Sequence, residues 1–440
     1  MQYLIVTEYE RIPRTEQNRK LLSQLQSFDE QRLRSTGDTI FDWNDRRFVK
    51  AKNYVGVIAV PGGVVEILPK IDTPDKGGNE RAQHNLLYML SITRKIVGEE
   101  RDLASIGKQK MPLLEQLITL FAEKTLKELK RGIDHAYVTQ EENLYRMKGK
   151  LLVGNHAVKN AVHKERFYCR YDDFISDTAI NRIIKASCQI LLLVSKTAAA
   201  QKKLREIVFL LDEVTDLEVA EHHFNAVHYS RNTERFKPIV SFAMLVIKGM
   251  SPIWTKGKDV SFSLLFPMEK LFEEFIARYV YRYAEEFGLS REHIHAQAVG
   301  RQEWLLQREH DQKDKFRLKP DLVIGEEHGD GLRLILDTKW KHLKSDEEDS
   351  TNGVSQGDIY QLYAYAHRYK CPENILLFPQ VNGVSAKSYS IIQGYCSHKI
   401  RVEFVKLNRD LKAEGKAFRD ELKGIFKLNI QTQPGNLNTE

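Results

Sequence analysis

Apolar residues recur at three- and four-residue spacing through the middle of the chain, which is the pattern of amphipathic helices. Toward the N-terminus the pattern changes: short apolar runs alternate with turns, most clearly where 54–60 and 64–68 flank the turn at 61–63. We therefore predict a β-rich N-terminal module over residues 1–80 and a mainly helical region over residues 81–250. Helical segments are expected at 113–130, 177–193, 198–211 and 238–247, with a strand-like stretch rich in Arg and Lys at 136–153.

Beyond residue 251 the pattern alternates between strands and helices. The predicted elements are a β-hairpin at 317–325 and 332–340, helices at 268–287 and 358–369, and strands at 374–378 and 400–405. We predict a C-terminal domain over residues 251–430, in which a mixed central sheet is flanked by helices. A polar, disordered tail is expected over residues 431–440. The whole chain should be a multidomain α/β protein.

The predicted hairpin carries two carboxylates, Asp321 and Asp337, that it would bring close enough to share one cation. The two-residue period of a strand places Lys339 on the same face as Asp337, while Thr338 faces away and offers its backbone carbonyl as a further ligand. Such oxygen ligands suit Mg2+, with Mn2+ as a substitute, and Mg2+ keeps waters that can act as the nucleophile. Lys339 would orient or help deprotonate that water and neutralise charge on a phosphate. These residues predict metal-dependent hydrolysis of phosphodiesters.

The spacing Asp-x-Lys alone is weak evidence, because it occurs three times, at 311–313, 337–339 and 410–412. Only the middle copy follows an apolar strand-like run, with a Pro-Asp pair upstream and Gln361 and Tyr365 downstream at a helical four-residue spacing. The plainer alternatives are a surface ion pair at a strand end and a solvated helix face. The combination favours a nuclease site, with Gln361 as a further candidate catalytic residue.

This series of motifs resembles the PD-(D/E)xK nuclease superfamily, in its RecB-like branch. Further stretches narrow the resemblance to the McrC family, the endonuclease subunit of McrBC-type modification-dependent restriction systems, over about residues 84–426. Those stretches lie at 85–90, 149–152, 170–185, 232–237 and 268–275. Carried over residue by residue, the family's catalytic Asp, Asp and Lys fall on Asp321, Asp337 and Lys339.

The resemblance also implies partners and a division of labour. McrC-like proteins supply the Mg2+-dependent site that cuts double-stranded DNA carrying modified cytosine, and they stimulate a hexameric McrB-like AAA+ GTPase that binds and translocates DNA. The helical region would dock onto and into that ring. The role of residues 1–80 is not covered by the resemblance.

Many nucleases of this superfamily place a glutamate on the helix before the hairpin. This chain offers Glu269, Glu273 and Glu274. We favour Glu273 as a catalytic residue, since it lies one turn after Glu269 while apolar neighbours would face the core. A solvated acidic helix face is an equally good interpretation.

Composition adds modest constraints. The net charge of +7 favours a polyanionic partner only weakly. The chain contains no Gly-x-x-x-x-Gly-Lys-Ser/Thr motif, so any nucleotide dependence should come from a partner. Without a signal peptide or a long apolar run, we expect a cytoplasmic protein that does not enter a membrane.

Several other polar clusters have simpler explanations than a metal site. The four cysteines, Cys169, Cys188, Cys371 and Cys396, are scattered and are expected to be buried, reduced thiols. Acidic residues at 172–177 are better explained by a helix N-cap at Ser176 or Asp177 than by metal binding. His222, His223 and His228 have no converging acid or Cys and are expected to be structural or exposed.

Three functional interpretations remain open from the sequence. The first is an endonuclease subunit that depends on a GTPase partner. The second is a stand-alone RecB-like DNA repair nuclease, which would not need the long helical region. The third is a non-catalytic assembly subunit, against which the complete set of Asp321, Asp337 and Lys339 counts.

Overall fold

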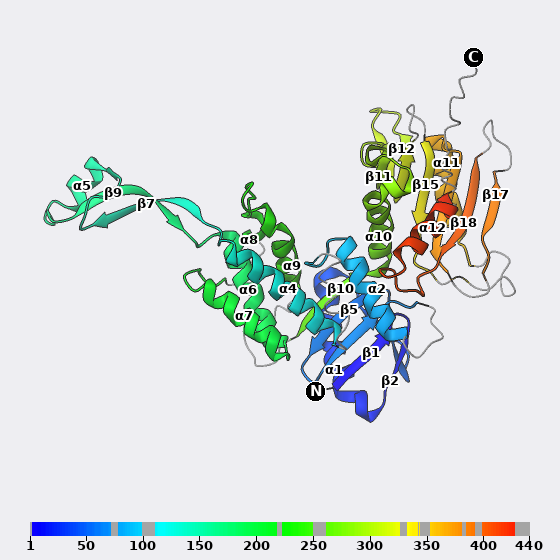
Figure 1. Cartoon of the computed structure of the whole chain (residues 1–440), viewed down its shortest axis with the longest axis horizontal. Coiled ribbons are helices and arrows are strands. Elements are labelled where there is room, and N and C mark those ends of the chain that lie inside the picture. Colours follow the sequence, from blue (N-terminus) through cyan, green and yellow to red (C-terminus); the bar gives the residue numbers. More distant parts are fainter. Residues whose placement is uncertain are drawn as a thin grey trace, which may run out of the picture.

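The structure, a computed structural model, shows a mixed α/β protein with a projecting arm (Figure 1). It describes residues 2–71, 78–98, 111–217, 222–249, 261–325, 332–341, 343, 353–380, 384–391 and 398–426. The predicted tail at 431–440, the hairpin turn at 326–331 and Cys396 lie outside these residues. Within them, no helix is both long and apolar enough to cross a membrane.

The N-terminal part is built on a four-stranded sheet with the order β1-β6-β5-β10. Its strands are β1 (Gln2–Thr7), β5 (Tyr54–Val60), β6 (Gly63–Leu68) and β10 (Phe262–Pro267). The predicted hairpin over 54–68 is confirmed as β5 and β6. The fourth strand, β10, was not predicted here: it arrives from about 200 residues later and pairs antiparallel with β5.

One face of this sheet is covered by α1 (Glu16–Thr36), a 21-residue helix that the prediction of a β-rich module omitted. Leu21, Leu22 and Leu25 of α1 pack against strand residues of β5 and β6 in a separate apolar cluster. A small three-stranded sheet completes the part, from β2 (Arg11–Pro13), β3 (Phe41–Asp42) and β4 (Phe48–Ala51).

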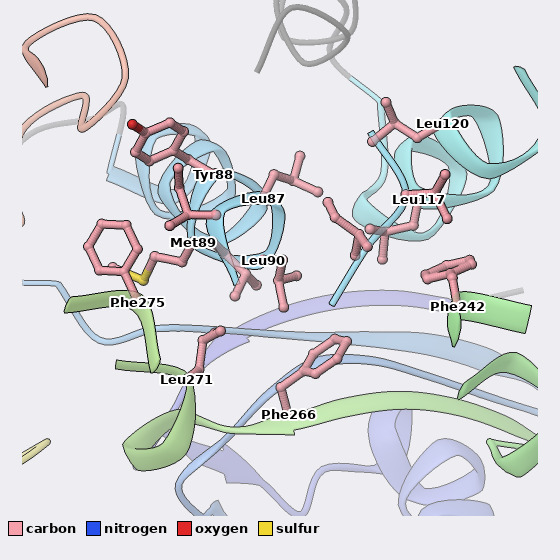
Figure 2. Packing of buried hydrophobic residues seen from close by; sticks show 14 of the residues in the cluster. Leu87, Tyr88, Met89, Leu90, Leu117, Leu120, Phe242, Phe266, Leu271 and Phe275 are labelled. Carbon is pink, nitrogen blue, oxygen red and sulfur yellow. The ribbon is translucent and has the colours of Figure 1, made fainter. Parts of the chain in front are cut away.

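The middle part is a group of helices, and all four predicted segments are helical. The helices are α2 (Gly78–Ile92), α4 (Leu113–Lys130), α6 (Ala179–Val194), α7 (Ala198–Leu210), α8 (His222–Asn225), η1 (Glu234–Phe236) and α9 (Lys237–Lys248). Figure 2 shows that α2, α4 and α9 share one apolar core with β10 and the next helix, α10 (Met268–Arg282). The core is therefore continuous from the N-terminal sheet into the C-terminal part.

The N-cap predicted for the helix at 177–193 is wrong. Thr178 caps α6, with its side chain accepting a hydrogen bond from the backbone N–H of Asn181. Asp177 instead pairs with Arg182, whose Nε donates to Asp177 Oδ1 at 2.7 Å, and accepts a hydrogen bond from the Thr215 hydroxyl. The Arg182 guanidinium holds the pKa of the Asp177 carboxyl well below its usual range.

An arm projects from the helical part and makes a β-ribbon of its own (Figure 1). It consists of β7 (Ala136–Leu144), β8 (Lys150–Leu151), α5 (Val153–Lys159) and β9 (Phe167–Ile175). β7 pairs antiparallel with β9 along its whole length. The strand-like stretch at 136–153 is confirmed in part, and β9 was missed.

The C-terminal part is a six-stranded mixed sheet with the order β11-β14-β15-β16-β18-β17. The strands are β11 (Ile294–Ala296), β14 (Leu322–Gly325), β15 (Leu332–Thr338), β16 (Glu373–Pro379), β17 (Lys387–Ser390) and β18 (Lys399–Val405), beside a separate hairpin of β12 (Glu303–Gln307) and β13 (Asp314–Leu318). α10 and α12 (Gly415–Phe426) pack on one face, and α11 (Gln356–Tyr369) packs on the other. Two short 3-10 helices, η3 (Ala284–Phe287) and η4 (Arg291–His293), follow α10. The predicted mixed sheet between helices is confirmed.

Candidate active site

The two carboxylates predicted on the hairpin lie opposite each other. β14 and β15 pair antiparallel with Leu322 opposite Leu336, so continuing the register places Asp321 opposite Asp337. Asp337 is only 2% exposed although it carries a carboxyl group. Such burial is costly for an ionised group unless other groups compensate its charge.

Asp321 is held by the backbone and side chain of Thr338. The Thr338 N–H donates to Asp321 Oδ2 at 2.6 Å, and its hydroxyl donates to the same oxygen at 2.7 Å. The Thr338 side chain therefore contacts a carboxylate of the site, and the prediction that it faces away is wrong. These two hydrogen bonds connect Asp321, just before β14, to Thr338 at the end of β15.

Lys339 lies beside Asp337 and is fixed by α11. Its Nζ is 2.7 Å from Asp337 Oδ2 and donates to Gln361 Oε1 at 3.1 Å. Gln361 Nε2 in turn donates to the Tyr365 hydroxyl at 2.7 Å. The structure therefore brings together the Asp-x-Lys and Gln-x-x-x-Tyr motifs that are separate in the sequence.

The three glutamates of α10 have different surroundings. The negative charge of Glu273 contributes to the raised pKa of both Asp321 and Asp337. Its Oε1 accepts a hydrogen bond from Gln297 Nε2 at 2.8 Å. The charge of Glu269 instead contributes to the raised pKa of Glu8. Glu274 forms an ion pair with Lys95, with Oε1 3.0 Å from Nζ. Of the three, Glu273 is the one placed toward the aspartates.

Charge in this cluster is unbalanced. Burial, and then the charges of neighbouring carboxylates, raise the pKa of Asp321 above its ordinary value. Burial also raises the pKa of Asp337, although the charge of Lys339 acts in the opposite direction. Burial alone would lower the pKa of the Lys339 ammonium, but Asp337, Asp358 and Asp321 outweigh it and raise the pKa. Lys339 therefore stays protonated, and its ammonium faces three carboxylates, of which Asp337 is the most buried.

The donor set fits a small hard cation that needs few protein ligands. In the described part of the chain, the buried Asp337 Oδ2 has the Lys339 ammonium, 2.7 Å away, as its one polar partner. Among the residues that the structure describes, no three His, Cys, Asp or Glu side chains form a ready-made metal cage. Mg2+ commonly uses one or two carboxylates and keeps several waters, whereas a structural zinc site needs four protein ligands.

Asp358 is a residue of this cluster that the sequence analysis missed. Its Oδ1 lies 3.9 Å from Lys339 Nζ, and its Oδ2 lies 3.1 Å from Lys341 Nζ. It also completes a capping box with Ser355 at the start of α11. Its three-residue spacing from Gln361 on one helix face was the available signal.

The acidic residues at 172 and 173 lie in β9 and have partners in the arm, not at the helix start that was predicted for them. Asp172 accepts a hydrogen bond from Thr139 at 2.6 Å, and Asp173 pairs with Lys148 at 3.2 Å, both within the arm. Among the cysteines that the structure describes, Cys169, Cys188 and Cys371 are buried thiols outside any disulfide. The prediction of reduced, buried thiols is confirmed for these three.

Comparison with known proteins gives consistent matches. A family model described as the McrBC 5-methylcytosine restriction system component matches residues 49–379. The type IV methyl-directed restriction enzyme EcoKMcrBC of Escherichia coli (strain K12) is 21% identical over 345 residues, which cover 74% of this chain and 95% of that protein.

Two solved structures have a similar fold. One is a chain of the refined half-complex from the tetradecameric assembly of Thermococcus gammatolerans McrB AAA+ hexamers with bound McrC, with a TM-score of 0.69, 22% identity, and coverage of 96% of this chain and 100% of that chain. The other belongs to the cryo-EM structure of the Thermococcus gammatolerans McrBC complex, with a TM-score of 0.54, 24% identity, and coverage of 64% and 88%. At these identities the likeness establishes the fold.

Proposed function

The chain belongs to the family of McrBC 5-methylcytosine restriction system components, and from this premise we propose that it is the Mg2+-dependent DNA endonuclease subunit of a modification-dependent restriction complex. The observation that carries the proposal is the half-buried Asp321 opposite the buried Asp337, with the Lys339 ammonium beside Asp337. We further propose that the C-terminal sheet is a PD-(D/E)xK nuclease fold, because it presents these residues on adjacent strands between helices.

In the proposed reaction, Asp321, Asp337 and the Thr338 carbonyl would hold Mg2+. The bound ion would supply Lewis-acid activation of the phosphate and of a water. Lys339 acts as a fixed positive charge that orients the water and stabilises negative charge on the phosphate. Its role as a base is disfavoured, because the surrounding acids raise its pKa. Gln361 holds the ammonium in place from α11.

The proposal includes a partner that moves on DNA. One related structure contains McrB AAA+ hexamers with bound McrC, and we propose that this chain likewise binds and stimulates an McrB-like GTPase hexamer. The arm of β7, β8, α5 and β9 is the segment best placed for such docking, because it extends away from the body (Figure 1). The substrate of the complex would be double-stranded DNA with modified cytosine.

The test is cleavage of methylated and unmethylated plasmid in the presence of Mg2+. The chain is assayed alone and together with the AAA+ protein encoded beside it, with and without GTP. The proposal predicts cutting of methylated plasmid only with partner and GTP. Cutting by the chain alone would favour a stand-alone repair nuclease. No cutting, with GTPase stimulation retained, would favour a non-catalytic assembly subunit.

Two variants test the residues of the site. Asp337→Ala or Lys339→Ala should abolish cleavage, whereas GTPase stimulation and complex assembly stay intact. Lys313→Ala is the matched control, because Lys313 has the same Asp-x-Lys spacing but its side chain is 71% exposed in a surface hairpin. Equal cleavage by Lys339→Ala and Lys313→Ala would remove Lys339 from the mechanism.

A further inference from the structure

One buried hydrogen bond joins the N-terminal sheet directly to the end of the catalytic strand. Trp340 Nε1 donates to Glu8 Oε1 at 2.6 Å. Trp340 is 2% exposed and follows Lys339 immediately in the chain, while Glu8 is completely buried just after β1. The two residues are 332 positions apart, so the contact is made only by the folded chain.

Glu8 is fixed from the N-terminal side by backbone groups. Its Oε1 also accepts a hydrogen bond from the Lys70 N–H at 2.9 Å, and its own N–H donates to the Leu68 carbonyl at 2.9 Å. The accepting carboxylate therefore lies at the edge of the sheet where β1 and β6 end. A carboxylate held in this way can define the position of the indole that binds it.

Trp340 also contacts the helix that carries Glu273. Its ring packs edge-on against Phe272, with ring centroids 5.2 Å apart. That helix begins on the same N-terminal sheet, because β10 runs into α10 and the Met268 N–H donates to the Asn53 carbonyl at 2.9 Å. The N-terminal module therefore contacts both the strand and the helix that carry the candidate site.

We propose that Glu8 is a positioning residue of the nuclease site, which it orders by holding the indole of Trp340 and thereby the end of β15. The inference rests on the proposed function and assigns a role to the N-terminal module. β15 ends at Thr338, so Lys339 lies beyond the last strand residue. Its backbone is held there by a hydrogen bond from its N–H to the Leu377 carbonyl at 2.9 Å and by the neighbouring Trp340. If the indole of Trp340 were held less firmly, the Lys339 ammonium and the Thr338 carbonyl would move from their positions in the site.

Four variants separate positioning from simple folding. Trp340→Phe keeps an aromatic ring against Phe272 but removes the donor, and Glu8→Ala removes the acceptor. Glu8→Gln should rescue, because burial raises the pKa of Glu8 to about 7 and an amide oxygen can accept the same bond. Trp43→Phe is the matched control, since Trp43 Nε1 donates to the Asp29 carboxylate at 2.8 Å in the same module without touching β15.

The first measurement is single-turnover cleavage by the complete complex. Trp340→Phe and Glu8→Ala should slow it by roughly tenfold or more, since small displacements of catalytic groups can cost about 100-fold. DNA affinity and GTPase stimulation should not change, and Glu8→Gln and Trp43→Phe should cut at the wild-type rate. Wild-type rates in Trp340→Phe and Glu8→Ala would overturn the inference, as would a Glu8→Gln variant as slow as Glu8→Ala.

The second measurement does not depend on activity. Hydrogen exchange of the full chain should be faster at 332–341 in Trp340→Phe and Glu8→Ala, and unchanged there in Trp43→Phe. If the wild type cuts no DNA under any condition, the proposed function fails. Faster exchange at 332–341 would still support the coupling, and unchanged exchange would overturn it.

Discussion

Replacing Asp321 with Asn should make the metal-free protein more stable while removing its cleavage activity. The reason is the unbalanced charge of the site: Asp321 is half-buried beside the buried Asp337, and both pKa values are raised. Asn keeps an oxygen that can accept the two hydrogen bonds from Thr338. The substitution thus removes a buried charge and retains its contacts.

The sign of the pH dependence follows from the raised pKa. An acid whose pKa is higher in the folded state binds its proton more tightly when folded, so the free energy of unfolding is highest at low pH. It falls as pH rises from the ordinary pKa of 3.8 to the raised value of Asp321, and stays low above it. A pKa that is higher by one in the folded protein than in the unfolded chain corresponds to about 1.4 kcal/mol. We expect Asp321→Asn to gain at least this amount at pH 8, and little at pH 4.

The assay is thermal unfolding in EDTA at pH 4 and pH 8, followed by addition of Mg2+. A gain of about 1 kcal/mol should raise the Tm by roughly 2–4 °C in a domain of this size. Mg2+ should stabilise the wild type more than the variant, because binding to the folded state adds stability. Asp311→Asn is the control, since Asp311 lies 3.3 Å from Arg308 in a surface hairpin. A variant that melts below the wild type at pH 8 would refute the reasoning.

Two further outcomes follow from other parts of the chain. Replacing residues 137–174 of the arm with a short Gly-rich turn should leave the Tm unchanged, because the ribbon pairs with itself, but should abolish stimulation of the GTPase; a large loss of Tm would contradict the first expectation. The thiols of Cys169, Cys188 and Cys371 should resist alkylation until the chain is unfolded, since all three are buried and burial raises the pKa of the Cys188 thiol. Rapid alkylation of any of these three cysteines in the folded chain at pH 8, located by mass spectrometry, would contradict this expectation.

Local patterns in the sequence predicted most of the helices and the central hairpin. The periodicity at 113–130 matches α4 at both ends, because its apolar stripe faces a single core. The placement of Asp337, Lys339 and Gln361 could also be predicted, since strand and helix periods fix which side chains share a face. These are short-range rules, and they worked where one element faces one neighbour.

Long-range contacts could not be predicted in the same way. Nothing in the composition of β10 distinguishes a strand of the N-terminal sheet from a strand of the C-terminal one, so its partner was unknown. The bond from Trp340 to Glu8 depends on that same assembly. The strand β9 was missed because its acidic residues at 172 and 173 suggested a helix start, whereas they pair across the ribbon.

The pairing of β10 with β5 has a consequence for synthesis of the chain. All seven residues of β5 are buried in the finished fold, yet the strand that covers its open edge begins about 200 residues later. At about 5–20 residues per second, a ribosome would leave this edge unpaired for roughly 10–40 s. An apolar strand edge left open in this way invites pairing with other chains. The nascent protein should therefore depend on chaperones that bind it during translation, until residue 267 has left the exit tunnel.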